Sequence, residues 1–305
     1  MKYKKDWLNG KTIVISGASS GIGAQVSKLL VKKYNCKVIG IARNENKMQN
    51  FVKDLGESAK NFSYYLFDVS DEQSWEQFAI NLKNDKIQID VLINNAGFLP
   101  AFNKATMQDV EQTKNSMQTN FYSSIYAYKQ LYSNLTNSTS PCIVNICSSD
   151  ALCPLVGTSL YASSKGAMKN YFEAMQIEEN QNMHIGLIYP GFVKTDIFKN
   201  QTNEKDKIVD KFSMNAEKAA KKIVKAIKKC KKRKVIGFDA LFMDFMYRHF
   251  PKFSLRFFAY ILRKSKIKLY KDVFWFRYWN NFLYMIICIR GKNENIRFNW
   301  TYAFR

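Results

Sequence analysis

The sequence of 305 residues is poor in the residues that build metal sites and disulfide frameworks. It has only two histidines, and none of its six cysteines has the Cys-x-x-Cys spacing of a zinc site. We therefore expect no metal, and we interpret the cysteines as reduced thiols. The cysteines are Cys36, Cys142, Cys147, Cys153, Cys230 and Cys288.

Long apolar segments are also missing. The N-terminus, MKYKKDWLNGKTIVISG, is basic but has no apolar core before its first strand-like run. We therefore expect no secretory signal and a cytoplasmic location. No run reaches the roughly eighteen apolar residues of a membrane-spanning helix, and even residues 274–289 are interrupted by Arg277.

Acidic residues are scarce in the last third of the chain. Residues 1–200 hold 21 Lys and Arg against 17 Asp and Glu, whereas residues 201–305 hold 26 against 8. The net charges are thus +4 and +18. From Phe238 onward 21 of 68 residues are aromatic. Basic and aromatic residues together favour contact with an anionic surface, such as that of a membrane.

Short apolar runs alternate with segments of helical periodicity between residues 12 and 200. Several runs are continuously hydrophobic, as in strands that are buried on both faces of a parallel sheet. This order predicts an α/β fold with a doubly wound, Rossmann-like parallel sheet. The expected strands are 12–16, 37–42, 62–69, 91–97, 141–148, 184–191 and 234–238, and the expected helices include 21–34, 74–83 and 216–229.

Three glycines follow the first expected strand, in the segment SGASSGIG. Gly17, Gly21 and Gly23 have the spacing G-x-x-x-G-x-G at a junction between a strand and a helix. Glycines there let the backbone approach a pyrophosphate, which the N–H groups of the following helix bind. An ordinary turn without a ligand is the alternative interpretation.

Tyr161 and Lys165 lie one helical turn apart in the segment YASSK. A free phenol has a pKa of about 10, and an ammonium roughly 4 Å away would bring it toward neutral pH, where it can act as an acid or base. The same spacing recurs at Tyr260 and Lys264, in YILRK. The spacing alone therefore does not select the functional pair.

Five ordered features resemble the short-chain dehydrogenase/reductase (SDR) family over about residues 10–240. The resemblance selects Tyr161, because Tyr260 lacks the companion serine and the Pro-Gly turn. The features are the glycine turn with Ser16 in place of the family's threonine, NNAG at residues 94–97, Asn120, Ser148 thirteen residues before Tyr161, and YPGFVKT at residues 189–195.

The resemblance implies catalysis by Asn120, Ser148, Tyr161 and Lys165. Tyr161 would give a proton to a carbonyl oxygen while the nicotinamide delivers a hydride to the carbon. Lys165 would hold the nicotinamide ribose, Ser148 the substrate oxygen, and Asn120 a water that connects Lys165 to solvent. The four together predict an oxidoreductase that interconverts a ketone and a secondary alcohol.

The end of the second expected strand bears on the choice of cofactor. Arg43 follows it at once and no acidic residue stands there, which favours NADP(H), although a solvated arginine is the alternative. By resemblance, Asp68 would meet the adenine amine and Val69 its ring. The expected cofactor-binding residues are Gly17, Ser19, Ser20, Gly21, Ile22, Gly23, Arg43, Asp68, Val69, Asn94, Ala96, Gly97, Tyr161, Lys165, Pro190, Gly191, Val193 and Thr195.

The segment after the Pro-Gly turn is expected to cover the substrate. In this lid, residues 196–214, Ile197 and Phe198 suggest an apolar wall and a lipophilic substrate, such as a hydroxysteroid or a long-chain 3-oxoacyl group. A 3-oxoacyl carrier-protein reductase is one alternative. A non-enzymatic nucleotide-binding scaffold on a membrane is another, but a scaffold has no need of the four implied catalytic residues.

We divide the chain into an SDR domain, residues 1–238, and a basic, aromatic extension, residues 239–305. The extension has three interpretations: a membrane-surface contact, a core-packing or dimer-forming segment, or a dock for an acidic carrier protein. No recognition motif indicates nucleic acid. The resemblance implies a homodimer or homotetramer.

Overall fold

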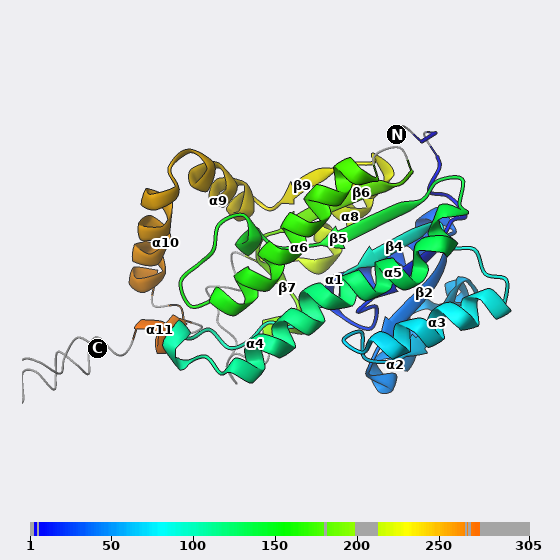
Figure 1. Cartoon of the computed structure of the whole chain (residues 1–305), viewed down its shortest axis with the longest axis horizontal. Helices are drawn as coiled ribbons and strands as arrows, with labels where there is room; N and C mark the ends of the chain where they lie inside the picture. The colour runs from blue at the N-terminus through cyan, green and yellow to red at the C-terminus, as the bar shows by residue number, and fades with distance from the viewer. Residues whose placement is uncertain are drawn as a thin grey trace, which may run out of the picture.

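Seven parallel strands form the centre of the structure (Figure 1). The structure is a computed structural model that describes residues 3–4, 6–179, 182–198, 213–265, 267 and 270–274. The strand order β3-β2-β1-β4-β5-β6-β9 confirms the predicted doubly wound sheet. The strands are β1 (Thr12–Ser16), β2 (Lys37–Ala42), β3 (Phe62–Leu66), β4 (Val91–Asn94), β5 (Cys142–Ile146), β6 (His184–Pro190) and β9 (Arg233–Ile236).

Several strands end earlier than their apolar runs predict, and β3 and β4 fall furthest short, by three residues each. In β3 the last pair is Ala42 with Leu66, and only the N–H of Phe67 still reaches β2. In β4 pairing ends at Asn94, because the next two N–H groups bind the Ser16 hydroxyl of β1 instead of a strand carbonyl. In both strands the chain therefore leaves the sheet before the predicted segment ends.

Helices cover both faces of the sheet because its side chains alternate between two apolar cores. Ile13 and Ile15 of β1 enter one core and Val14 enters the other. The first core holds α1 (Gly21–Tyr34), α2 (Glu45–Leu55) and α8 (Ala216–Lys228). The second holds α3 (Glu72–Asn84), α5 (Ser123–Thr136) and α6 (Ser159–Glu178).

Shorter elements connect these layers. Helix α4 (Val110–Met117) continues through a π-helical turn, η3 (Gln118–Tyr122), into α5. Two short strands, β7 (Val193–Lys194) and β8 (Met214–Asn215), pair with each other. The 3-10 helices are η1 (Gly56–Asn61), η2 (Ala105–Met107), η4 (Ser149–Ala151) and η5 (Asp196–Phe198).

The C-terminal segment forms α9 (Phe238–His249), α10 (Pro251–Ser265) and α11 (Lys271–Phe274). Helices α9 and α10 lie at the end of the molecule opposite α2 and α3 (Figure 1). Asp239 in the first turn of α9 accepts the N–H of Phe192 at 2.7 Å. Asp244 pairs with Arg233 of β9 at 2.7 Å, so α9 is tied to the sheet.

Some expectations fall outside the described residues. Of the expected lid, 196–214, the structure describes 196–198 and 213–214, and it describes nothing beyond residue 274. Among the helices that the structure describes, none is both long and apolar enough to cross a membrane.

Gly23 and Gly166 are helical glycines with contrasting surroundings. A Cβ at Gly23 would lie 2.1 Å from the carbonyl oxygen of Gly17, whereas one at Gly166 would meet nothing within 4 Å. We expect Gly23→Ala to lower the free energy of unfolding by on the order of 3 kcal/mol, because the glycine turn must move. Gly166→Ala should raise it by about 0.5–1 kcal/mol. Urea denaturation measures both values, and equal stabilities would contradict this account.

Candidate active site

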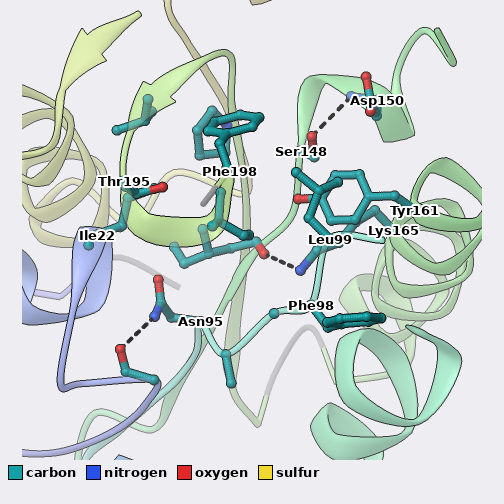
Figure 2. A pocket seen from close by; sticks show the side chains of 18 of the residues that line it. Ile22, Asn95, Phe98, Leu99, Ser148, Asp150, Tyr161, Lys165, Thr195 and Phe198 are labelled. Carbon is teal, nitrogen blue, oxygen red and sulfur yellow. Dashed lines mark hydrogen bonds between the residues drawn. The ribbon is translucent and has the colours of Figure 1, made fainter. Parts of the chain in front are cut away.

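A cavity of about 410 Å³ lies at the carboxyl ends of the central strands (Figure 2). Gly17 after β1, Asn95 after β4, Ser148 after β5 and Pro190 at the end of β6 all line it. Because the strand order reverses between β1 and β4, the helices that follow these strands cover opposite faces and leave a crevice.

The glycine turn forms one wall of this cavity. Gly17 and Gly21 have positive φ, at 70° and 55°, which glycine adopts without strain. Helix α1 begins at Gly21, and its N-cap residue Ser20 makes no side-chain capping bond. The first N–H groups of α1 therefore keep their capacity to bind an anion, as the pyrophosphate of a dinucleotide requires.

The hydroxyl of Ser16 fixes the loop after β4 to the end of β1. Its oxygen accepts the N–H groups of Asn95 and Ala96, both at 3.0 Å. In return, the Asn95 side chain donates to the carbonyl oxygens of Ser16 and Gly17, at 2.9 and 3.3 Å. These four bonds hold together the two strand ends at the centre of the site, where Figure 2 shows the side chain of Asn95.

Two basic side chains line the cavity beside the glycine turn. Arg43 follows β2 and Lys47 lies in the first turn of α2. The guanidinium of Arg43 pairs at 3.0 Å with the carboxylate of Asp68, which also accepts the Ser70 hydroxyl at 2.7 Å. Lys47 was missed by the sequence analysis, although a second basic residue four positions after Arg43 was a usable signal.

Ser148, Tyr161 and Lys165 line the same cavity (Figure 2). The two residues on α6 face it together because they lie one turn apart. Lys165 is 2% exposed, and its ammonium donates to the carbonyl of Ile146 at 3.0 Å. Ser148 caps the short helix η4, and its oxygen accepts the N–H of Asp150 at 3.2 Å.

The protein surroundings do not lower the pKa of Tyr161 as the spacing predicts. Burial raises the pKa of this phenol above its usual value, the negative charge of Asp150 adds to the rise, and the hydrogen bond with Ser148 opposes it. Lys165 does not offset burial here, because its ammonium is directed at the Ile146 carbonyl. Burial also lowers the pKa of Lys165.

Asn120 lies beneath the cavity rather than in its wall. Its carboxamide accepts the N–H of Phe98 at 2.6 Å and donates to the Phe98 carbonyl at 2.8 Å. It also donates at 2.8 Å to the hydroxyl of Ser164, which itself donates to the backbone carbonyl of Tyr161. Through its place in a π-helical turn, Asn120 connects the loop after β4 to α6.

The cavity wall includes most, but not all, of the expected residues. The expected residues that do not line it are Ser19, Gly23, Asp68, Val69, Asn94 and Asn120. The amide of Asn94 instead donates to Asn145 at 2.8 Å in the sheet. The lining residues that the sequence analysis did not select are Lys47, Asn95, Phe98, Leu99, Phe102, Ile146, Cys147, Ser149, Asp150, Phe192 and Tyr270.

Apolar side chains form a further part of the cavity wall. Leu99 and Phe102 come from the loop after β4, and Ile197 and Phe198 from the described part of the expected lid. Tyr270, from the C-terminal segment, packs on Phe102 with a ring distance of 5.0 Å. The extension therefore supplies part of the cavity wall.

The second Tyr-x-x-x-Lys pair lies elsewhere. Tyr260 is on α10 with 56% of its side chain exposed, and it does not line the cavity. The ammonium of Lys264 lies 5.9 Å from the centre of its ring. The structure therefore places only the first pair, Tyr161 and Lys165, beside the glycine turn.

The fold and the cavity define a doubly wound α/β protein of the dinucleotide-binding class, with its site where the strand order reverses. The chain belongs to the short chain dehydrogenase family, because the sequence model of that family matches residues 11–206.

Named relatives and solved structures resemble the chain. An 11-beta-hydroxysteroid dehydrogenase A of Sesamum indicum is 28% identical over 66% of this chain and 58% of its own length. A benzil reductase of Saccharomyces cerevisiae is 30% identical over 62% of this chain and 74% of its own. A short chain dehydrogenase from Burkholderia cenocepacia, solved with NADP, superposes with a TM-score of 0.70 at 18% identity, over 82% of this chain and 98% of its own.

The first of these matches is partial. The chain spans little more than half the length of the curated hydroxysteroid dehydrogenases from Sesamum indicum and Arabidopsis thaliana, at 58% and 54%. The likeness to the Burkholderia structure, at 18% identity, shows the fold.

Ser16→Ala tests the connection between β1 and the loop after β4. The substitution leaves the N–H groups of Asn95 and Ala96 without their acceptor, so we expect the free energy of unfolding to fall by about 1–3 kcal/mol. Ser16→Thr keeps the oxygen and should stay within about 1 kcal/mol of the original chain. Urea denaturation compares the variants. If alanine and threonine were equally tolerated, the two bonds would not hold the site together.

Proposed function

We propose that the chain is an NADP(H)-dependent oxidoreductase that interconverts a ketone and a secondary alcohol on a lipophilic substrate. This proposal rests on one observation. Ser148, Tyr161 and Lys165 line the same cavity as the glycine turn, where the N-cap residue of α1 makes no side-chain capping bond. A scaffold that only binds a nucleotide needs the turn but not the other three side chains.

Each of these side chains has a role that its position supports. Tyr161 holds its proton at neutral pH, because its pKa is raised, and donates it to the carbonyl oxygen during reduction. Ser148 holds that oxygen by a hydrogen bond, and Lys165 binds the ribose of the cofactor. The nicotinamide, when bound, exchanges a hydride with the substrate carbon. Asn120 positions α6 and the loop after β4 around these groups.

The basic side chains beside the glycine turn favour NADP(H) over NAD(H). Arg43 and Lys47 both line the cavity, whereas Asp68, which is paired with Arg43, does not. Two cations would stabilise the negative charge of the 2′-phosphate of NADP(H). The free ribose 2′-hydroxyl of NAD(H) is instead bound by an acidic side chain that accepts its hydrogen bond. The NADP in the Burkholderia structure is consistent with this choice.

The apolar wall favours a lipophilic ketone. Leu99, Phe102, Ile197 and Phe198 offer no charge to a substrate that lies against them. Two relatives are named for hydroxysteroid and benzil chemistry, and both names describe bulky apolar molecules. A steroid ketone or a long-chain 3-oxoacyl group fits this wall.

Tyr161→Phe tests the proposed chemistry. We expect NADPH-dependent reduction of a panel of steroid ketones, 3-oxoacyl thioesters and small ketones to fall by roughly 10²–10⁴-fold in this variant, because the proton donor is removed. NADPH binding, followed by fluorescence, should remain. NADH should support less turnover than NADPH in the original chain.

Tyr260→Phe is the matched control, because Tyr260 belongs to the other Tyr-x-x-x-Lys pair and should keep full activity. Unchanged turnover in Tyr161→Phe would refute the assigned role. NADPH binding without turnover of any substrate would favour the scaffold. Activity only on thioesters of an acidic carrier protein, lost at high salt, would favour the carrier-protein reductase.

We also propose that the outer face of α9 and α10 rests on an anionic membrane surface. Phe253 and Tyr260 on α10 are 57% and 56% exposed, and Phe245 on α9 is 53% exposed. The exposed cations Lys252 and Arg256 lie among them, while the opposite face of α10 packs inward. Apolar side chains with neighbouring cations are typical of helices that lie in a lipid interface.

Sedimentation with lipid vesicles tests this contact. We expect the full chain to bind vesicles that contain phosphatidylserine more strongly than vesicles of phosphatidylcholine alone, and to be released by salt. Phe253→Ser with Tyr260→Ser should weaken binding at least severalfold, because apolar contact is lost. Ile177→Ser, at a 77% exposed site on α6, is the control. The proposal would fail if the control substitution weakened binding equally. It would also fail if the chain bound vesicles with and without phosphatidylserine equally well.

A further inference from the structure

Asp239, in the first turn of α9, contacts a turn of the chain that lines the cavity. Its carboxylate accepts the backbone N–H of Phe192 at 2.7 Å. An acidic residue in the first turn stabilises a helix by itself, but this effect does not account for a contact with another segment. Asp244, later on the same helix, instead pairs with Arg233 and Arg248. The contact with Phe192 therefore calls for a separate explanation.

Gly191, the residue before Phe192, leaves space for this carboxylate. A Cβ at Gly191 would lie 2.1 Å from an oxygen of Asp239, and its three nearest atoms would all belong to that side chain. The φ of Gly191 is not in the left-handed region, so the backbone conformation does not require glycine. The position of the Asp239 carboxylate does require it.

Three hydrogen bonds fix the Pro-Gly turn, residues 190–192. The N–H of Gly191 donates to the carbonyl at the end of β9 at 2.8 Å, and the carbonyl of Phe192 accepts the first N–H of β8 at 2.8 Å. Asp239 supplies the third bond, at the N–H of Phe192. Without Asp239 this partly buried donor would lose its partner, and the turn would lose its contact with α9.

The ring of Phe192 also contacts the C-terminal segment. It lines the cavity and stacks on Phe198 at a ring distance of 6.0 Å. It packs in addition against a buried cluster that contains Met243 of α9. Helix α9 therefore supports the Pro-Gly turn through a side chain as well as through the backbone.

The Pro-Gly turn borders the reacting groups of the site. Strands β5 and β6 are paired, so the turn at the end of β6 lies beside Ser148, which follows β5, and both line the cavity. Thr195, three residues beyond the turn, reaches the start of α1 (Figure 2), where it would lie 3.1 Å from a Cβ at Gly21. A dinucleotide that binds the glycine turn and reaches Tyr161 would therefore lie along this segment.

We propose that Asp239 is a positioning residue that holds the Pro-Gly turn against the reactive end of the dinucleotide. The C-terminal segment thereby takes part in forming the site, although its sequence lies outside the implied catalytic set. This inference rests on the proposed function. Because the glycine turn and the two cations beside it bind the other end of the dinucleotide, loss of Asp239 should disturb the reactive end without releasing the cofactor.

Asp239→Ala and Asp239→Asn test this role. We expect alanine to lower kcat for NADPH-dependent ketone reduction by roughly 10–100-fold, because the reactive end is misplaced, while the Kd of NADPH changes by less than about threefold. Asparagine keeps an oxygen that accepts the N–H of Phe192, so kcat should stay within about threefold of the original chain. The fluorescence of the bound nicotinamide reports its surroundings without turnover. At saturation it should differ from the original chain in the alanine variant and match it in the asparagine variant.

Asp244→Ala is the matched control, because Asp244 ties the same helix to Arg233 of β9 and does not line the cavity. It should lower the melting temperature at least as much as Asp239→Ala, and leave kcat and the nicotinamide fluorescence unchanged. The role of Asp239 is overturned if the control lowers kcat equally, if asparagine is as slow as alanine, or if alanine leaves kcat and fluorescence unchanged.

Gly191→Ala gives a test of the contact that needs no cofactor. The added methyl group would clash with the Asp239 carboxylate, and Asp239→Ala removes the three atoms nearest to it. We expect Gly191→Ala to lower the melting temperature by about 2–4 °C in the original chain, and by clearly less in Asp239→Ala. Additive losses would overturn the contact.

Failure of the proposed function is distinct from failure of this contact. It would appear in the original chain, as absence of NADPH binding or of turnover with any ketone. That result would overturn the role of Asp239 in the reaction, whereas the melting temperatures of the Gly191 and Asp239 variants would still decide the contact.

Discussion

The parallel pairing of β1 with β4 is the constraint on which the rest of the structure depends. The chain fills one half of the sheet with β1, β2 and β3, then returns past β1 to build the other half. The helices that follow β1 and β4 must therefore cover opposite faces, and the ends of these strands cannot be closed by either layer. The glycine turn and the loop after β4 occupy this gap, and the cavity is its consequence.

Buried polar groups turn this gap into a defined site. Ser16 and Asn95 exchange hydrogen bonds across the gap, and Asn120 connects the loop after β4 to α6. Neither Ser16 nor Asn120 lines the cavity. The residues that line it nevertheless depend on these two side chains for their positions. Polar networks of this kind specify one arrangement, because a slipped arrangement would leave several buried donors unsatisfied.

The C-terminal segment connects the site to the surface of the molecule. Its inner side chains, Tyr270 and Val273, close the substrate wall, while the outer face of α10 presents aromatic and basic residues to solvent. Packing on the domain and contact with a membrane are therefore compatible interpretations of one segment.

The local pattern of the sequence determined by itself most of the strands and several residues of the site. Continuous apolar runs predicted the strands, and the order of the short motifs selected Ser148, Tyr161 and Lys165, because these features depend on neighbours in the chain. Only the tertiary structure decided the ends of β3 and β4, the direction of the pKa shift of Tyr161, and the place of Tyr270 in the wall. Burial and contacts between distant segments govern these properties, and no local spacing records them.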